Sequence, residues 1–279
     1  RHLGKLKLGH TGTLDPLASG LLLIAVGEAT KLCQYAVLDD KTYEFTITFG
    51  SATSTDDAEG EIINTKQVPD NLYACLEKLL PQFTGPISQT PPAFSAIKIA
   101  GERAYSLARQ GKEVSIEKRT VNVYELGLLN VSTPEAEFRA SVSKGTYIRS
   151  LGRDIALAAG SCGYISKLRR SSLGKFTIMQ AIPLAKLVEM SYKEVCSSLL
   201  LPVDIILDDI LDYQLSEFEE RELRYGRVIK APSVIHTDYG FIKAKRLGRL
   251  VALLKPEGKE ASTILHPIKV FNIGVNDVD

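Results

Sequence analysis

The sequence contains no tryptophan, only two methionines and only four cysteines among its 279 residues. The cysteines form no Cys-x-x-Cys pair, and the four histidines include no pair four residues apart, so the ligand patterns of zinc and iron–sulfur sites are missing. We therefore expect no metal and no cofactor. We expect reduced, buried thiols, as in a cytosol-like compartment, at the four positions Cys33, Cys75, Cys162 and Cys196.

Long apolar runs are also missing. No stretch of eighteen apolar residues lacks a charge or a strong breaker, which excludes a membrane-spanning helix. No signal peptide is visible, and the chain begins Arg1-His2 without an initiator methionine. We expect a cytoplasmic protein with no membrane partner, and organellar targeting stays open because a targeting segment would lie upstream.

A large charge of one sign is absent too, because 34 Lys+Arg against 33 Asp+Glu give a net charge of +1. A nucleic-acid partner would have to bind a local basic patch. Residues 144–175 provide one candidate, with seven basic side chains and the single acid Asp154, and residues 98–119 provide a weaker one. A solvated charged face explains these stretches equally well.

Hydrophobic periodicity predicts a mixture of strands and helices. Residues 43–49 and 136–142 alternate as half-buried strands do, while 72–83 and 146–159 carry the spacing of helices. The short apolar run at 21–26 predicts a buried strand. Because no regular βαβ repeat occurs, we expect an α+β fold with a mixed, largely antiparallel sheet and flanking helices.

The composition changes near residue 200. An acidic segment at 204–222 indicates a solvated connection or surface helix. Beyond it, short strand-like pieces at 228–229, 241–244, 250–254 and 268–273 indicate a small β-rich domain. We therefore expect a first domain at 1–205 and a second domain at 213–279.

The segment GHTGTLDPLASG at 9–20 is the first candidate site. Its glycines permit unusual backbone geometry, and Asp15 precedes a proline, which favours an extended conformation and a fixed carboxylate direction. The simpler alternative is an ordinary helix start with Asp15 as N-cap and Pro16 at the first helical position.

Two further residues allow similar alternatives. Tyr43 is either a core aromatic or a functional ring at the start of its strand. Arg149 is either a solvated surface charge or the partner of a buried carboxylate. GxSxG, GxxxxGK[ST] and GxGxxG are absent, so hydrolase, P-loop and dinucleotide sites lack their motifs.

Five segments together resemble the TruB family, the tRNA pseudouridine-55 synthases. GHTGTLDPLASG at 9–20 is similar to that family's catalytic motif. Four other segments follow in the family's order: KTY at 41–43, PPAFSAIK at 91–98, SKGTYIR at 143–149 and LRRS at 168–171. The resemblance covers about residues 4–175, and the strand that the family has before Gly4 is missing.

The resemblance implies the pseudouridine synthase fold, with a PUA-like RNA-binding domain from about residue 213. It implies that Asp15 is the nucleophile, that Arg149 pairs with it, and that Tyr43 stacks on the target uracil and takes a proton at the sugar C2′. It also assigns RNA or substrate contacts to Tyr147, Leu168 and His10, and the basic stretch adds Lys144, Arg169 and Arg170.

The implied partner is tRNA, bound through its T-loop and acceptor stem by a monomeric enzyme. Two alternatives stay open: an RNA-binding and folding module without catalysis, and a guide-RNA-directed relative that needs accessory proteins. A glycoside hydrolase would need a second positioned carboxylate beside Asp15, and the sequence offers no evident candidate.

Overall fold

A computed structural model describes residues 6–36, 38, 40–95, 97–99, 102–105, 110, 116–258 and 263–272. The chain forms two compact units. The first, here called the sheet unit, comprises Leu14–Leu21 and Leu38–Ala181. The second, here called the tail unit, comprises Arg1–Thr13, Leu22–Val37 and Ile182–Asp279. This division differs from the expected boundary between residues 205 and 213.

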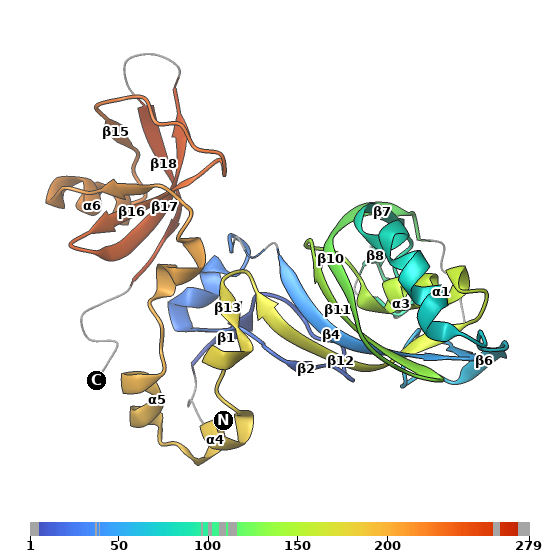
Figure 1. Cartoon of the computed structure of the whole chain (residues 1–279). Coiled ribbons are helices and arrows are strands. Elements are labelled where there is room, and N and C mark those ends of the chain that lie inside the picture. Colours follow the sequence, from blue (N-terminus) through green and yellow to red (C-terminus); the bar gives the residue numbers. More distant parts are fainter. Residues whose placement is uncertain are drawn as a thin grey trace. The chain divides into compact units, whose positions relative to one another are not determined.

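A seven-stranded sheet is the centre of the sheet unit (Figure 1). Its order is β13-β12-β4-β11-β10-β7, with β2 beside β12. All pairings are antiparallel except the parallel pair of β2 and β12. The strands are β2 (Ser19–Gly20), β4 (Lys41–Phe49), β7 (Gly85–Gln89), β10 (Arg119–Ser132), β11 (Glu135–Val142), β12 (Gly163–Leu173) and β13 (Phe176–Thr177). The expected mixed α+β fold is confirmed.

Helices α1 (Leu72–Leu79) and α3 (Ile148–Ala158) pack on one face of this sheet (Figure 1). Alternation in β4 directs Tyr43, Phe45 and Ile47 into the same core. Asn71 caps α1, since its side chain accepts from the Ala74 amide at 3.1 Å. Both helices lie where the 3.6-residue spacing predicts them, and α1 continues as the 3₁₀ turn η2 (Leu80–Phe83).

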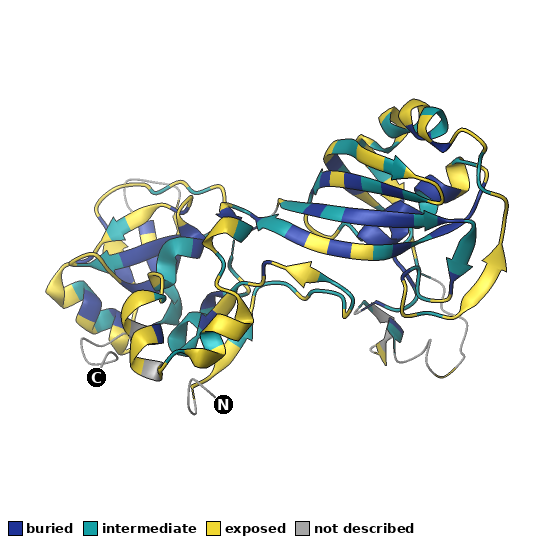
Figure 2. Ribbon diagram, turned by 60° about the horizontal axis from the view of Figure 1, so that its bottom comes forward, coloured by how far each residue is buried: buried dark blue, intermediate teal, exposed yellow. Residues whose placement is uncertain are grey.

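The opposite face of the sheet carries polar side chains. Figure 2 shows buried residues alternating with less buried ones along its strands. Glu44 of β4 lies between Arg139 of β11 and Arg169 of β12, so opposite charges are neighbours across three strands. This face is called the outer face below.

Short elements complete the sheet unit. Hairpins are formed by β5 (Ser51–Thr53) with β6 (Ile62–Thr65), and by β8 (Lys98–Ile99) with β9 (Glu102–Arg103). A 3₁₀ turn, η3 (Ile178–Gln180), follows β13. Much of the weaker basic stretch at 98–119 lies outside the described residues, namely 100–101, 106–109 and 111–115.

The tail unit contains a five-stranded sheet of order β14-β16-β17-β18-β15. The strands are β14 (Asp212–Gln214), β15 (Ile229–Ala231), β16 (Ile242–Arg246), β17 (Arg249–Glu257) and β18 (Thr263–Val270), so strands stand at or beside each predicted β-like piece. Within the acidic segment at 204–222, for which a solvated connection or a surface helix was expected, residues Glu217–Arg224 form helix α6, with Ser216 and Glu219 as its capping box. The remaining elements are β1 (Leu8–His10), β3 (Ile24–Val26), η1 (Gly27–Leu32), α4 (Leu184–Glu189), α5 (Tyr192–Ser198) and η4 (Val203–Leu207).

Hydrogen bonds and ring contacts explain why early residues belong to the tail unit. The Asn272 amide donates to Glu28 Oε2 at 2.9 Å, and the rings of Tyr35 and Phe241 lie 5.4 Å apart. The prediction of a buried strand at 21–26 is partly wrong, because β3 covers only half of that run and Ile24 is 47% exposed.

The structure bears on the expectations about buried cysteines and about membrane-spanning helices. Of the three cysteines whose side chains are described, only Cys162 is buried, while Cys33 and Cys75 are half-buried, and all three are free thiols. No helix in the described part of the chain is long and apolar enough to cross a membrane.

Candidate active site

Asp15 lies on a tight turn. The Ala18 amide donates to the Asp15 carbonyl at 2.9 Å, and the chain then enters β2. The alternative of a helix beginning at Pro16 is therefore wrong. Gly20 explains how the loop returns to the sheet: its φ is +100°, and a Cβ there would lie 2.3 Å from the Arg170 carbonyl oxygen.

Asp15 forms a two-pronged ion pair with Arg149. Arg149 Nε donates to Asp15 Oδ2 and Nη2 to Oδ1, both at 2.9 Å. Arg149 stands in the first turn of α3 and is only 5% exposed, while the Asp15 side chain is 29% exposed. A planar guanidinium bound in this way fixes the plane of the carboxylate. The prediction that Arg149 pairs with a carboxylate is thus confirmed in the geometry.

Arg149 also joins two loops to this pair. Its Nη1 donates to the Thr55 carbonyl at 3.1 Å, and its Nη2 to the Phe94 carbonyl at 3.1 Å. Asp57 lies 3.6 Å from Nη1, and its side chain is 4% exposed. Asp57 was not singled out from the sequence, because one acid in a polar loop carries no spacing signal. One arginine therefore connects Asp15, a buried second carboxylate and the middle of the 91–98 segment.

A second arginine, one helical turn further on, repeats this pattern. Arg153 Nη1 donates to Asp56 Oδ2 at 2.8 Å, and Nη2 donates to the Thr90 carbonyl at 3.0 Å. Asp154 Oδ1 accepts from Arg153 Nε at 3.0 Å. Burial raises the pKa of both carboxyls, Asp56 and Asp154, although Arg153 opposes the shift. These ion pairs hold the same two loops that Arg149 contacts.

Tyr43 is 9% exposed, and its hydroxyl lies within range of the Asp15 charge. Burial raises the pKa of its hydroxyl and the negative charge of Asp15 adds to that, while the charge of Arg170 and a hydrogen bond from it lower the pKa. The nearness of Asp15 and Tyr43 is consistent with the functional alternative for this ring.

Arg170 differs from the expected surface contact with RNA. It is fully buried, and its Nε donates to the Leu21 carbonyl at 2.8 Å. Arg170 lies beside Tyr43 in the pairing of β12 with β4, and Arg169 lies beside Glu44. Because successive strand residues point to opposite faces, only Arg169 is left on the outer face, where it is exposed.

Tyr147 is positioned by Gln89, which the sequence did not single out. The Tyr147 amide donates to Gln89 Oε1 at 2.8 Å, and Gln89 Nε2 donates to the Tyr147 carbonyl at 3.0 Å. Arg119 lies over the Tyr147 ring, 4.7 Å from its centre. Lys144 is exposed on the turn before Tyr147, whereas Leu168 is 6% exposed in the core.

His10 belongs to the tail unit, where it ends β1 and is exposed. The other sequence-predicted residues, from Asp15 to Arg170, lie in the sheet unit. No group of three or more metal-ligating side chains was found within the described parts of the chain.

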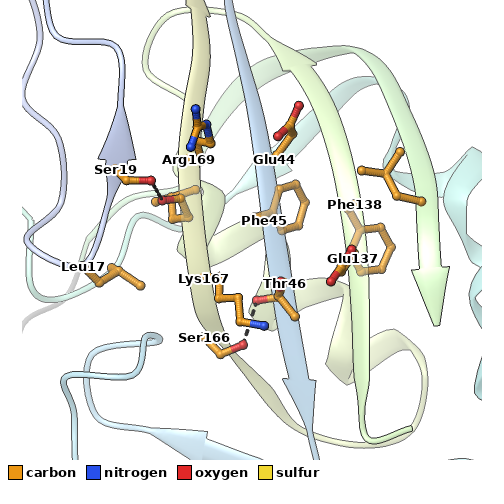
Figure 3. A pocket seen from close by; sticks show the side chains of 12 residues that line it. Leu17, Ser19, Glu44, Phe45, Thr46, Glu137, Phe138, Ser166, Lys167 and Arg169 are labelled. Carbon is orange, nitrogen blue, oxygen red and sulfur yellow. Dashed lines mark hydrogen bonds between the residues drawn. The ribbon is translucent and has the colours of Figure 1, made fainter. Parts of the chain in front are cut away.

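A shallow groove of about 430 Å³ runs along the outer face (Figure 3). Its lining combines the acids Glu44 and Glu137 with the bases Lys167 and Arg169. Neither Asp15 nor Arg149 lines it. Leu17 and Ser19 of the GHTGTLDPLASG segment also line it, as does Leu168, so the groove is shared by the outer face and the segment that carries Asp15.

Comparisons with known proteins show which family the chain resembles. Residues 1–148 match the TruB family pseudouridylate synthase (N-terminal domain). The tRNA pseudouridine synthase B of Zymomonas mobilis is 43% identical over 268 residues, which are 94% of this chain and 85% of that protein. The same enzyme of Novosphingobium aromaticivorans is 46% identical over 231 residues, covering 81% and 76% of the two chains.

Solved structures give the same fold. One chain in a crystal structure of a Cbf5-Nop10-Gar1 complex superposes with a TM-score of 0.69 at 25% identity, covering 96% of this chain and 77% of that one. A chain of the archaeal box H/ACA sRNP Nop10-Cbf5 complex has a TM-score of 0.68 at 22% identity, over 96% and 78%, which shows the fold alone.

Proposed function

The chain belongs to the TruB family of pseudouridylate synthases, and on this premise we propose that it converts uridine to pseudouridine at position 55 in the T-loop of tRNA. The observation that carries the proposal is the two-pronged pairing of Asp15, in the GHTGTLDPLASG segment, with Arg149 of the SKGTYIR segment. Relatives named tRNA pseudouridine synthase B support this substrate over a guide-RNA-directed role, because they match at 43% and 46% identity.

The chemistry suits a site with one reacting carboxylate. The reaction breaks the bond from C1′ to N1 of the uracil and forms a bond from C1′ to C5. A proton leaves C5 and N1 gains one, so no electron carrier and no imported group is needed. Asp15 can attack C1′, attack C6 or promote elimination to a glycal, and only the elimination uses removal of a proton at C2′.

Arg149 holds both Asp15 oxygens and thereby sets the direction from which the carboxylate meets the nucleotide. Tyr43, whose hydroxyl is within range of the Asp15 charge, would stack on the uracil and accept the proton at C2′. Tyr147 and Leu168 would line the nucleotide pocket, with Tyr147 held by Gln89.

The target uridine must leave the stacked loop before Asp15 can reach it. Extruding a base costs a few kcal/mol, which stacking on aromatic rings and contacts to the backbone must offset. We assign the stacking to Tyr43 and backbone contacts to the exposed Lys144 and Arg169. His10 would take the place of the extruded base in the RNA stack. The buried Arg170 is not assigned a backbone contact.

The test uses the purified chain alone with a T-loop transcript, with pseudouridine measured after digestion. We expect conversion without a guide RNA or accessory protein. Asp15→Asn should lower the rate by at least about 10⁴-fold, or about 5.4 kcal/mol, while RNA binding survives. Asp70→Asn, an exposed carboxyl before α1, is the matched control and should keep the parental rate. Rates within about tenfold for Asp15→Asn would remove Asp15 from the chemistry.

We further propose that the enzyme is a cytoplasmic monomer and that the β-rich segment at 213–279 is a PUA-like domain that binds the acceptor stem. The five-stranded sheet of the tail unit supports a separate binding surface. Whole tRNA should then bind more tightly than its isolated T-arm. Equal affinities would argue against the acceptor-stem contact, and sedimentation of the free protein checks the monomer.

A further inference from the structure

Arg170 is the largest fully buried side chain of the described residues. A contact with RNA at the surface, which the sequence predicted for this residue, does not explain its burial. Removing a guanidinium from water costs several kcal/mol unless its donors are satisfied. Its neighbour Arg169 stays exposed on the outer face. The sheet therefore directs Arg170 into the core, to the face that carries Tyr43.

The contacts of Arg170 connect the two sides of the reaction site. Its Nε donates to the Leu21 carbonyl, and its own carbonyl accepts from the Leu21 amide, each at 2.8 Å. Leu21 ends the loop that begins at Asp15. The Arg170 side chain also hydrogen-bonds the Tyr43 hydroxyl. One residue thus contacts both the end of the Asp15 loop and Tyr43.

The direction of the hydrogen bond between Arg170 and Tyr43 follows from chemistry. A guanidinium has only donors and stays protonated in proteins, so the Tyr43 oxygen must be the acceptor. A positive charge and a donor at the phenolic oxygen both favour its deprotonated form. They partly oppose burial and the charge of Asp15, which raise the pKa of the hydroxyl.

We propose that Arg170 is a positioning residue for the isomerisation: it fixes the Tyr43 hydroxyl relative to the Asp15 loop and stabilises its deprotonated form, which is the form that can accept a proton. The inference rests on the proposed function and on the proton-accepting role of Tyr43.

The proton transfer that Arg170 would assist is balanced. Tyr43 first loses its hydroxyl proton to water. The phenolate then takes the proton from C2′ and becomes a phenol, and the electron pair of the broken C2′–H bond forms the double bond between C1′ and C2′. The uracil leaves with the electron pair of the bond from C1′ to N1. When C5 then bonds to C1′, Tyr43 returns the proton to C2′, and the proton of C5 is transferred to N1.

The first experiment follows the Tyr43 hydroxyl directly, without any RNA. Tyrosine labelled with ¹³C at Cζ is titrated by NMR, and the resonance missing from Tyr43→Phe identifies Tyr43. Arg170→Gln, which removes the charge, should move the titration of Tyr43 upward by at least about one pH unit. Arg139→Gln is the matched control, because Arg139 lies in the neighbouring strand β11 but is exposed on the outer face. An unmoved titration in Arg170→Gln would overturn the proposal.

The second experiment measures single-turnover rates in a double-mutant cycle. Arg170→Gln should lower the rate by at least about tenfold when Tyr43 is present, and by less than about threefold when it is combined with Tyr43→Phe. Equal losses in both backgrounds would mean that Arg170 is only a structural support of β2. Should the Gln variant fail to fold, Arg170→Lys keeps the charge and one donor, and it should show a smaller loss with the same dependence on Tyr43.

The two measurements separate the failure of this inference from that of the proposed function. A parental enzyme that makes no pseudouridine would refute the function, and the titration would still decide whether Arg170 controls the Tyr43 hydroxyl. If the unsubstituted enzyme is active but the rate losses from Arg170→Gln and Tyr43→Phe are independent of each other, the inference about Arg170 is refuted and the proposed function stands.

Discussion

Arg149→Lys is the perturbation that probes the site most sharply, because it keeps the positive charge but removes the planar fork. Two parallel bonds to Asp15 and two bonds to the Thr55 and Phe94 carbonyls depend on that fork. The buried Asp57 still faces a cation in the variant, so the fold should survive. The lysine can keep at most one of the two bonds to Asp15.

The expected loss of rate follows from the missing bond to Asp15, because the bonds to the Thr55 and Phe94 carbonyls do not touch the reacting carboxylate. A hydrogen bond between charged groups contributes about 1.5–3 kcal/mol. If the lost bond orients Asp15 only in the reacting geometry, the single-turnover rate should fall by about 10- to 150-fold. RNA affinity should change less, because Asp15 is not proposed to contact the RNA backbone.

The assay uses a T-loop transcript labelled with tritium at uracil C5, since that hydrogen leaves when C5 bonds to C1′. Enzyme in saturating excess over RNA removes binding from the measured rate, and thermal unfolding checks the fold. Arg139→Lys, the same change on the exposed outer face, serves as the control. A rate within about threefold of the parent would refute the reasoning that the fork positions Asp15.

Four further predictions follow. Tyr43→Phe should bind RNA normally yet react about 10²- to 10⁴-fold more slowly, and Tyr43→Leu should also bind about 1–3 kcal/mol more weakly; parental behaviour of both would leave Tyr43 a core residue. The pKa of Asp56 is raised in the folded state, so the folded protein binds this proton more tightly than the unfolded chain does. Asp56 therefore makes the free energy of unfolding fall as the pH rises from 3.8, its usual pKa, through its raised pKa in the folded state. Urea unfolding of Asp56→Asn should lose this pH dependence, and an unchanged slope would contradict it. Gly20→Ala should lower the free energy of unfolding by more than about 2 kcal/mol, since its Cβ would collide with the Arg170 carbonyl. Gly85→Ala is the control, because Gly85 has a similar φ of +90° but open space at the Cβ position. Its smaller loss would measure the backbone strain without the collision. Arg169→Ala should reduce the slope of log affinity against log salt by about 0.7–0.9, and an unchanged slope would mean a merely solvated side chain.

The sequence predicted those elements whose signal is local. Alternation at 43–49 and 136–142 and helical spacing at 72–83 reflect which side of one element is buried, and the structure has strands and helices there. The run at 21–26 was misjudged because six apolar residues carry no information on what covers them. Only the neighbouring elements of the tail unit decide that Ala25 is buried and Ile24 exposed.

The sequence by itself determined the family, the order of its motifs and the candidate pair of Asp15 and Arg149, because these depend on residue identity and spacing. The tertiary structure decided which polar groups became buried partners. Asp57, Gln89 and the pair of Asp56 with Arg153 meet their partners across more than fifty residues, so no local pattern marks them. Arg169 and Arg170 are identical in kind and adjacent in sequence. Only the register of β12 against β4 places one in solvent and the other beside Tyr43, because neighbouring residues of a strand point to opposite faces.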